Sequence, residues 1–510
     1  MRRCSTTWKS IPVSSGMWPA TIPRWWRPLC KLPPPTRRRS SRCLRSWRFR
    51  SRSREDTWPA TARLIRTEET RRGHTKTRRQ TKGRSMRDFG IVAAALLGPV
   101  IGLAASAPSE AATFEFGTLP LSVPDGFVVE QAAGPPLVER PVTCAFDEAG
   151  RLYVTESSGS NAPLAEQQKD PRHRVLRLED TDGDGIFDTR TVFADGLMML
   201  QGSLWHRGSL YIAAAPEILK LTDTDGDGVA DVREVWHDGG TLTGCGNDLH
   251  GPYLAPDGRI EFTKGAFAEQ VHDLPGRPGW TTRASHVFRC RPDGSDFEAV
   301  LTGGMDNPVD VAFTATGERL LSATFLEHPA GGHRDGVVHA VYGGVFGKDH
   351  GVLDGHARTG DLLPVLIQLG PAAACGLHVH SGFGLGSGLG GDAFACSFNL
   401  RCVTRHRLSP EAGSFRVESE PFLSGDSADF HPTDVIEDAD GSLLVVDTGG
   451  WYKLCCPTSQ LEKPAVTGAI YRIRRKAKPR PVDPRGLSIE WRGRKPSELA
   501  TLLADPRPAV

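Results

Sequence analysis

The feature that most constrains this chain is a repeated unit in which a Gly-containing turn separates two short apolar segments. Clear copies lie at 146–154, 255–262 and 437–446. A tight Gly turn between alternating apolar runs is typical of a β-hairpin. Six such units occur near residues 146, 205, 255, 314, 390 and 437. Spacings of roughly 50 to 70 residues leave room for a four-stranded sheet in each unit, so we predict an all-β, six-bladed β-propeller.

The charge of the chain changes sign near residue 85. Residues 1–85 hold 24 Lys/Arg against 4 Asp/Glu, whereas the remainder holds 38 against 56. The acidic remainder would repel phosphate, which argues against a nucleic-acid partner. The basic segment shows neither a helical nor a strand period. We interpret it as a disordered leader that results from a start placed too early, with the true start at Met86, and an RNA-binding arm is the alternative.

Met86 begins a segment with the features of a secretory signal. An apolar run at 89–103 is followed by Ala105-Ser106-Ala107, a small-x-small cleavage site. We therefore expect a signal peptide at 86–111, the propeller at 112–475, and at 476–510 a linker with the first helix of a truncated helical repeat. Export predicts a periplasmic location, or attachment to a membrane through an uncleaved signal. Adjacent cysteines at 455 and 456 form a vicinal disulfide, or each of them pairs elsewhere or stays free, which we favour slightly.

A second repeat stands directly before several of the hairpins. The sequences at 140–143, 307–310 and 431–434 are RPVT, NPVD and HPTD. In a propeller these segments enter the innermost strands, so their side chains would converge at the mouth of the central channel. We predict a ligand site there, with His250 as the catalytic base because imidazole titrates near neutral pH. The predicted ligand-binding residues are Arg140, Asn247, Asn307, Asp310, His380, His431 and Asp434. The alternative is that these groups cap strand ends and join neighbouring blades.

Two nearly identical acidic segments, DTDGDGIFD at 180–188 and DTDGDGVAD at 223–231, resemble the start of a calcium-binding loop. Carboxylates at positions 1, 3, 5 and 9 with Gly at position 6 can surround one calcium ion with oxygen atoms. The predicted ligands are Asp180, Asp182, Asp184, Asp188, Asp223, Asp225, Asp227, Asp231 and Glu234. No helical pattern flanks either segment, so we expect calcium-stabilised β-turns rather than EF-hands. Asp-Gly turns without a metal are the alternative.

Residues 113–475 resemble the N-terminal propeller of planctomycete-type membrane-bound dehydrogenase-like proteins, also labelled PVC-type haem-binding proteins. These proteins are related to glucose/sorbosone dehydrogenases. The resemblance is carried by NDLHGPYLAPDG at 247–258, KGAFAE at 264–269 and DTGGWYKLCCPTSQ at 447–460. It implies a propeller followed by HEAT-like repeats and often a cytochrome c domain. The dehydrogenase relatives bind pyrroloquinoline quinone with calcium and use a His base, for which His250 is the nearest candidate.

Two functions remain open from the sequence. The first is a quinoprotein-type sugar or alcohol dehydrogenase, in which hydride passes to the quinone and the electrons leave through a cytochrome c acceptor. The second is a non-catalytic propeller that binds carbohydrate or protein on its polar face.

Overall fold

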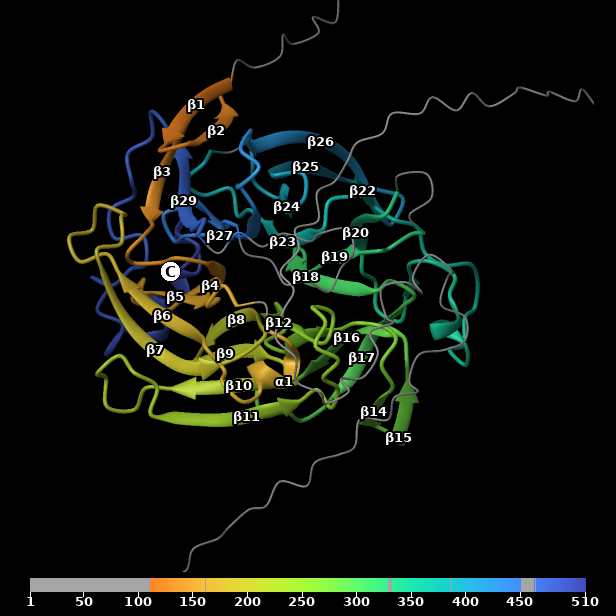
Figure 1. Cartoon of the computed structure of the whole chain (residues 1–510). Coiled ribbons are helices and arrows are strands. Elements are labelled where there is room, and N and C mark those ends of the chain that lie inside the picture. Colours follow the sequence, from red (N-terminus) through yellow and green to blue (C-terminus); the bar gives the residue numbers. More distant parts are fainter. Residues whose placement is uncertain (1–110, 161, 329–332, 387, 451–462, 464) are drawn as a thin grey trace, which may run out of the picture. The chain divides into compact units, whose positions relative to one another are not determined.

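The computed structural model describes residues 111–510 apart from 161, 329–332, 387, 451–462 and 464. The predicted leader at 1–85, nearly all of the predicted signal peptide and the Cys455-Cys456 pair lie outside the described residues. Six main sheets are arranged around a central axis (Figure 1), which confirms the predicted six-bladed propeller. In each blade one strand lies innermost, and the predicted Gly-containing connection joins it to the next strand of that blade.

The first four blades follow the chain in order, apart from the short last strand of blade 3. Blade 1 contains β4 (Pro141–Phe146), β5 (Leu152–Glu156), β6 (His173–Glu179) and β7 (Thr189–Leu197). Blade 2 contains β8 (Leu200–His206), β9 (Ser209–Ala214), β10 (Glu217–Thr222) and β11 (Val232–Asp238). Blade 3 contains β12 (His250–Leu254), β13 (Ile260–Lys264), β16 (Ser285–Cys290), β17 (Glu298–Gly303) and β21 (Val345–Phe346). Blade 4 contains β18 (Asn307–Phe313), β19 (Arg319–Thr324), β20 (Asp335–His339) and β22 (Ile367–Gly370).

The last two blades include strands from the start of the described chain. Blade 5 contains β23 (Ala374–Val379), β24 (Ala393–Ser397), β25 (Cys402–Glu411) and β26 (Ser414–Gly425), and the hairpin of β1 (Ala111–Phe116) and β2 (Leu119–Pro124) extends its outer edge. Blade 6 contains β27 (Pro432–Glu437), β28 (Leu443–Asp447) and β29 (Ala469–Arg475), and β3 (Phe127–Ala133) is its outermost strand. Pairing of β3 with β29 closes the ring, because it joins the two ends of the propeller in one sheet.

Every inner strand carries a β-bulge close to its start. Two residues of the inner strand oppose one residue of the second strand at 142–143, 201–202, 251–252, 309–310, 375–376 and 433–434. Neighbouring inner strands approach closely at these bulges. A Cβ atom on Gly202 would lie 2.1 Å from the carbonyl oxygen of Gly251, and one on Gly376 would lie 2.6 Å from the Cα of Asp434. The two glycines therefore permit the ring to close at this radius.

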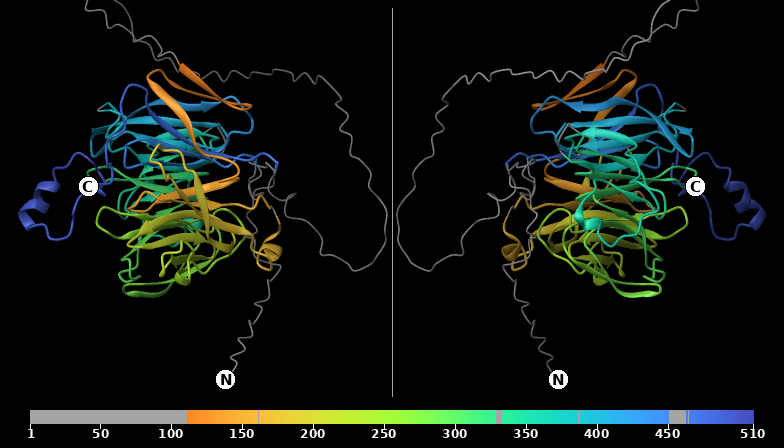
Figure 2. Two further views of the ribbon diagram at one scale, coloured as in Figure 1. Left: turned by 90° about the vertical axis from the view of Figure 1, so that its left-hand side faces the viewer. Right: turned by 90° about the vertical axis from the view of Figure 1, so that its right-hand side faces the viewer.

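The two ends of the channel differ. We call the end at which the inner strands begin the mouth end, and the end with the six Gly turns the turn end. The mouth end carries a long excursion at 157–172, which includes the short helix α1 (Leu164–Gln167), and the hairpin of β14 (Gln270–Leu274) and β15 (Arg277–Thr282). Figure 2 shows α1 and the C-terminal segment on opposite sides of the sheets.

The C-terminal segment contacts the turn end. Asp438, in the turn of blade 6, accepts a hydrogen bond from Arg485 at 2.6 Å. Arg480 lies 3.4 Å from Asp440. Beyond these contacts, α2 (Pro496–Leu502) begins with a capping box between Lys495 and Glu498 and buries no residue. Its assignment to a HEAT-like repeat remains a prediction. Among the described residues, no helix has the length and apolar character needed to cross a membrane.

Candidate functional site

Buried carboxylates fix the backbone segments that lead into the inner strands at the mouth end. Asp447 accepts the amides of His431 at 2.8 Å and Gly449 at 3.0 Å. Asp335 accepts the amide of Ala373 at 2.7 Å, and Glu156 accepts that of Arg140 at 3.3 Å. Burial raises the pKa of Asp447 to about 7. These carboxylates explain much of the polarity around the mouth by a structural role, because an unpaired buried amide is costly.

His250 connects three blades. Its Nε2 atom lies 2.6 Å from the carbonyl oxygen of Gly246 and 3.0 Å from Oδ1 of Asn307, to both of which it donates. The backbone of Gln201 also hydrogen-bonds the ring. Burial lowers the pKa of His250 to about 4, so the imidazole is neutral at physiological pH. These hydrogen bonds make His250 a structural link between blades. They give no support to its predicted role as a catalytic base.

Three predicted residues occupy equivalent places, directly before or at the start of an inner strand. They are Arg140, Asn307 and His431, and a proline directly follows each of them. This proline is the first residue of the inner strand in blades 1 and 6 and the second residue in blade 4. Arg140 lies beside Gly159 of the 157–172 excursion and pairs with Glu139 at 3.2 Å. His431 is buried and its Nδ1 donates to the carbonyl oxygen of Gly449 at 2.7 Å.

Asn247 lies in the connection that precedes β12. Its Nδ2 donates to the carbonyl oxygen of Ala266 at 3.2 Å, while its own carbonyl oxygen accepts the amide of Gly265 at 2.8 Å. Lys264 supports the same connection by donating to Oγ1 of Thr241 at 2.6 Å, and burial lowers the pKa of this lysine to about 8. The segment KGAF at 264–267 thus anchors the connection that carries Asn247 and His250.

His380 does not belong with the other predicted mouth residues. It follows the inner strand β23 instead of preceding it, which places it at the turn end. Its Nε2 atom donates to the carbonyl oxygen of Gly441 at 3.0 Å, and its Nδ1 accepts the amide of Gly382 at 2.8 Å. Polar residues near the hairpins are not all equivalent, because the two ends of a strand lie on opposite faces of the propeller.

Asp310 and Asp434 lie deeper in the channel, at equivalent bulges of blades 4 and 6. Asp310 accepts the amide of Leu377 in blade 5 at 2.7 Å, and Asp434 accepts the amide of Cys144 in blade 1 at 3.0 Å. Burial raises the pKa of Asp434 to about 6. Burial and the neighbouring Asp434 raise the pKa of Asp310 well above its usual value. Both carboxyl groups join neighbouring blades, which is the structural alternative to a ligand-binding role.

The two acidic loops connect the outer strands of blades 1 and 2 at the turn end. Carboxylate oxygens of Asp180, Asp182 and Asp184 lie within 4.8 Å of one another, and so do those of Asp223, Asp225 and Asp227. The two loops also share their internal hydrogen bonds. For example, the first aspartate of each accepts two glycine amides, at 2.8 and 2.7 Å in the first loop and 2.7 and 2.8 Å in the second.

The remaining predicted calcium ligands lie outside these groups. Asp188 accepts a hydrogen bond from the hydroxyl of Thr181 at 2.7 Å, and Asp231 does the same for Thr224. Glu234 pairs with Lys220 at 3.2 Å across β10 and β11. A strand pairing therefore turns the side chain at position 12 away from the loop. The structure brings together only positions 1, 3 and 5, and calcium binding remains a prediction.

We expect calcium to stabilise the propeller through these loops, because three clustered carboxylates repel one another without a cation. Excess chelator should lower the melting temperature of calcium-loaded protein. Calcium at about a hundredfold its Kd would contribute about 2.7 kcal/mol per site. Asp227→Ala should remove part of this response. Asp293→Ala, which changes an exposed turn aspartate outside both groups, should leave it unchanged. Equal melting curves with and without chelator would contradict the prediction.

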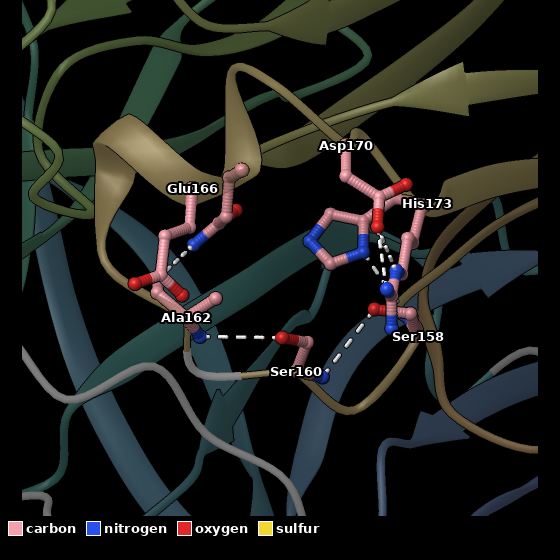
Figure 3. A pocket seen from close by; sticks show the side chains of 8 residues that line it. Ser158, Ser160, Ala162, Glu166, Asp170 and His173 are labelled. Atoms are coloured by element: carbon pink, nitrogen blue, oxygen red, sulfur yellow. Dashed lines mark hydrogen bonds and ion pairs between the residues drawn. The ribbon is translucent and has the colours of Figure 1, made fainter.

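A small polar cavity of about 250 Å³ lies within the 157–172 excursion at the mouth end (Figure 3). The lining residues are Ser158, Ser160, Ala162, Glu166, Gln167, Asp170, Arg172 and His173. This cavity was not predicted from the sequence, although the Ser-rich run at 157–160 was a usable signal.

The serines of the cavity wall bond to their own backbone. Ser158 Oγ accepts the amide of Ser160 at 3.3 Å, and Ser160 Oγ accepts the amide of Ala162 at 3.2 Å. Nδ1 of buried His173 accepts the amide of Ser158 at 3.0 Å. The excursion also meets the next connection, since a Cβ on Gly244 would lie 3.2 Å from that of Leu164.

Comparisons with known proteins identify a domain family and several structures. Residues 118–337 match a domain of unknown function, DUF7133. No curated protein sequence matches the chain. A Thermus thermophilus oxidoreductase described as a glucose dehydrogenase has 20% identity and a TM-score of 0.47, and the match covers 68% of this chain and all of that one. PQQ-bound aldose sugar dehydrogenase from Streptomyces coelicolor has 11% identity and a TM-score of 0.47, covering 69% and 100%. The apo aldose sugar dehydrogenase from Escherichia coli has 13% identity and a TM-score of 0.46, covering 69% and 100%.

The structural neighbours are thus described as sugar dehydrogenases, one of them PQQ-bound, at low sequence identity. The planctomycete-type assignment, the HEAT-like repeat and the cytochrome partner remain predictions from the sequence resemblance.

Proposed function

We propose that the mouth end binds a small, neutral, polyhydroxylated molecule such as a sugar or sugar alcohol. The observation that carries this proposal is the cavity of the 157–172 excursion, whose wall offers both hydrogen-bond donors and acceptors. The hydroxyl oxygens of Ser158 and Ser160 accept backbone amides, which leaves their O–H groups to donate. Glu166 adds a carboxylate acceptor. Sugar hydroxyls both donate and accept, so they complement such a wall.

The charges of the mouth end favour a neutral ligand. Arg172 pairs with Asp170 in the cavity, and Arg140 pairs with Glu139 beside it. Lys348 pairs with Asp306, and Arg334 pairs with Asp335 at 2.6 Å. These cations therefore already have anionic partners. At the two buried pairs, Arg334–Asp335 and Lys348–Asp306, an anionic ligand would compete with a carboxylate that is already in place.

Pyrroloquinoline quinone, the cofactor implied by the sequence resemblance, does not fit this described set of residues. The quinone carries three carboxylates, whereas four cations of the mouth end, Arg140, Arg172, Arg334 and Lys348, are each paired with an Asp or Glu. His250, the nearest candidate for a base, uses Nε2 to link blades. A sugar dehydrogenase activity with a cytochrome c acceptor is the second candidate function, and the resemblance over 113–475 is the observation that favours it.

Calorimetric titration with a panel of neutral sugars and sugar alcohols tests the proposal. We expect at least one to bind. Glu166→Gln, which removes an ionised acceptor, should weaken that binding roughly tenfold, the range expected for one hydrogen bond to a charged group. Glu418→Gln, an exposed glutamate on the outer hairpin of blade 5, serves as the matched control and should bind normally. Failure of every sugar to bind, or equal affinity in both variants, would overturn the proposal.

A parallel titration separates the second candidate. Pyrroloquinoline quinone and calcium are added to the same protein, and the absorbance of bound quinone and sugar-dependent dye reduction are measured. The proposed function predicts neither signal. A bound-quinone spectrum with sugar-dependent reduction would establish the dehydrogenase and would show that the mouth rearranges its ion pairs.

A further inference from the structure

Blade 3 holds a group of histidines outside the proposed binding site. His272 lies on β14, His286 on β16, and His356 follows the 3-10 helix η2 (Gly351–Leu353) in the insertion between the third and fourth strands of blade 4. Thr282, the last residue of β15, lies between two of them. Its Oγ1 atom is 2.9 Å from Nε2 of His286 and 3.0 Å from Nε2 of His356.

The partners of these groups fix the direction of every hydrogen bond. Nδ1 of His286 lies 3.0 Å from the carbonyl oxygen of Leu301, which can only accept, so the proton of this neutral imidazole is on Nδ1. Nε2 of His286 then accepts from the Thr282 hydroxyl. The hydroxyl proton is thereby committed, so His356 must donate its Nε2 proton to Thr282. Thr282 Oγ1 also accepts the amide of Ala284 at 3.1 Å.

A second connection holds the base of the β14–β15 hairpin. Nε2 of Gln270 donates to the carbonyl oxygens of Gly265 at 2.9 Å and Ala284 at 3.2 Å. Oε1 of Gln270 is therefore the acceptor for Nε2 of His272 at 3.2 Å. Gly265 in turn donates its amide to the carbonyl oxygen of Asn247 at the mouth. Two consecutive hydrogen bonds thus link the base of the hairpin to the mouth.

The surroundings favour the neutral form of these rings. His286 and His356 pack against Trp280 at centroid distances of 5.1 and 5.7 Å, and His272 packs against Phe288 at 4.5 Å. The charged groups that face the rings are cations, namely Arg277 beside His356 and Lys264 beside His272. Burial is the main reason that the pKa of His286 falls to about 3, that of His272 to about 4 and that of His356 below its usual value.

We propose that the His286–Thr282–His356 bridge is an acid-sensitive clamp that holds the 351–358 segment and the β14–β15 hairpin on blade 3. Protonated His286 carries a proton on Nε2 and can no longer accept from Thr282. The hydroxyl would then face three N–H donors, from His286, His356 and Ala284, with only two lone pairs. The hydrogen bond from His356 is the one expected to break. His286 lies on β16 and Ala284 directly precedes that strand, whereas His356 lies on the 351–358 segment outside the sheet. Acid therefore releases the 351–358 segment first.

Hydrogen exchange measured by mass spectrometry over a pH series tests the clamp in the full chain. After correction for the intrinsic pH dependence of exchange, peptides covering 347–358 and 270–282 should lose protection as the pH falls toward 4. The opening equilibrium should change up to about tenfold per pH unit for one coupled proton. Peptides from β27 and β28 of blade 6 should keep their protection over the same range.

Two variants make the test specific. Thr282→Val keeps the shape of the side chain but removes the hydroxyl, so the 347–358 peptides should open at neutral pH and lose their pH dependence. His406→Gln is the matched control. His406 is another buried histidine with a pKa of about 4, bonded to Thr404 and Ser419 in blade 5, and its loss should not affect these peptides. Full protection of 347–358 down to pH 4, or unchanged exchange in Thr282→Val, would overturn the proposal.

Discussion

Replacing Arg472 by methionine should lower the free energy of unfolding by about 3–5 kcal/mol, the cost expected when one partner of a buried ion pair is removed. Only 2% of Arg472 is exposed. Its Nη1 atom donates to Asp438 at 2.6 Å and to the hydroxyl of Ser442 at 2.6 Å. Its Nε atom donates to the carbonyl oxygen of Gly185 in blade 1 at 3.0 Å. The substitution would leave Asp438 to pair with Arg485 alone and would remove a link across the closure of the ring.

Arg474→Met on the same strand is the matched control. Arg474 pairs with Glu130 on β3, but both side chains are about one third exposed, at 32% and 35%. Solvent screens such a pair, so the loss should be about 1 kcal/mol or less. Urea denaturation of the three proteins measures the difference. If both substitutions destabilise the propeller equally, the ion pair between Arg472 and Asp438 does not have the stabilising role that its burial indicates.

Acidification from pH 6.5 toward pH 4 should destabilise the propeller steeply. Burial lowers the pKa values of five imidazoles to about 3 to 4. These imidazoles belong to His237, His250, His272, His286 and His406. Their pKa values in the unfolded chain are about 6.5. The unfolded state therefore binds more protons in this range, and stability falls as the pH falls through it.

Buried carboxyl groups with raised pKa values oppose this effect, and Asp310, Asp434 and Asp447 are examples. The folded pKa values of Asp310, Asp434 and Asp447 are raised, so these groups favour the folded state as the pH falls from about 7 toward their unfolded value. The lowered imidazoles, together with paired carboxyl groups of lowered pKa such as Glu437 and Asp438, leave a net uptake of protons on unfolding, so the free energy of unfolding should fall as the pH falls. Denaturation curves at a series of pH values measure this slope. A stability that is constant or rises between pH 6.5 and 4.5 would contradict it.

The fold could be predicted from the sequence because its signal is local and repeated. Each Gly turn lies between the first two strands of a blade, so six turns identified six inner hairpins. The strand that closes the ring could not be predicted in this way. The pairing of β3 with β29 joins residues more than 300 positions apart. The sequence of neither strand contains a local pattern that identifies the other.

The candidate site was predicted less well, for reasons that particular residues make clear. Arg140, Asn307 and His431 share a motif that fixes their register at the start of an inner strand, so their common location followed from the sequence. His380 lacks that motif, and no local pattern indicates which end of β23 it occupies. The link made by His250 depends on Asn307 and Gly246, whose positions are set only by the packing of blades 3 and 4.

The measurement that tests the central claim most directly is a hydrogen-exchange map of the protein saturated with the best-binding neutral sugar. Binding at the mouth end predicts added protection in peptides that cover 157–173, with smaller effects at 239–250. Peptides of the turn end, such as those at 380–392 and 438–442, should exchange as they do in the free protein. Protection confined to the turn end, or no protection at 157–173 under saturating sugar, would contradict the account.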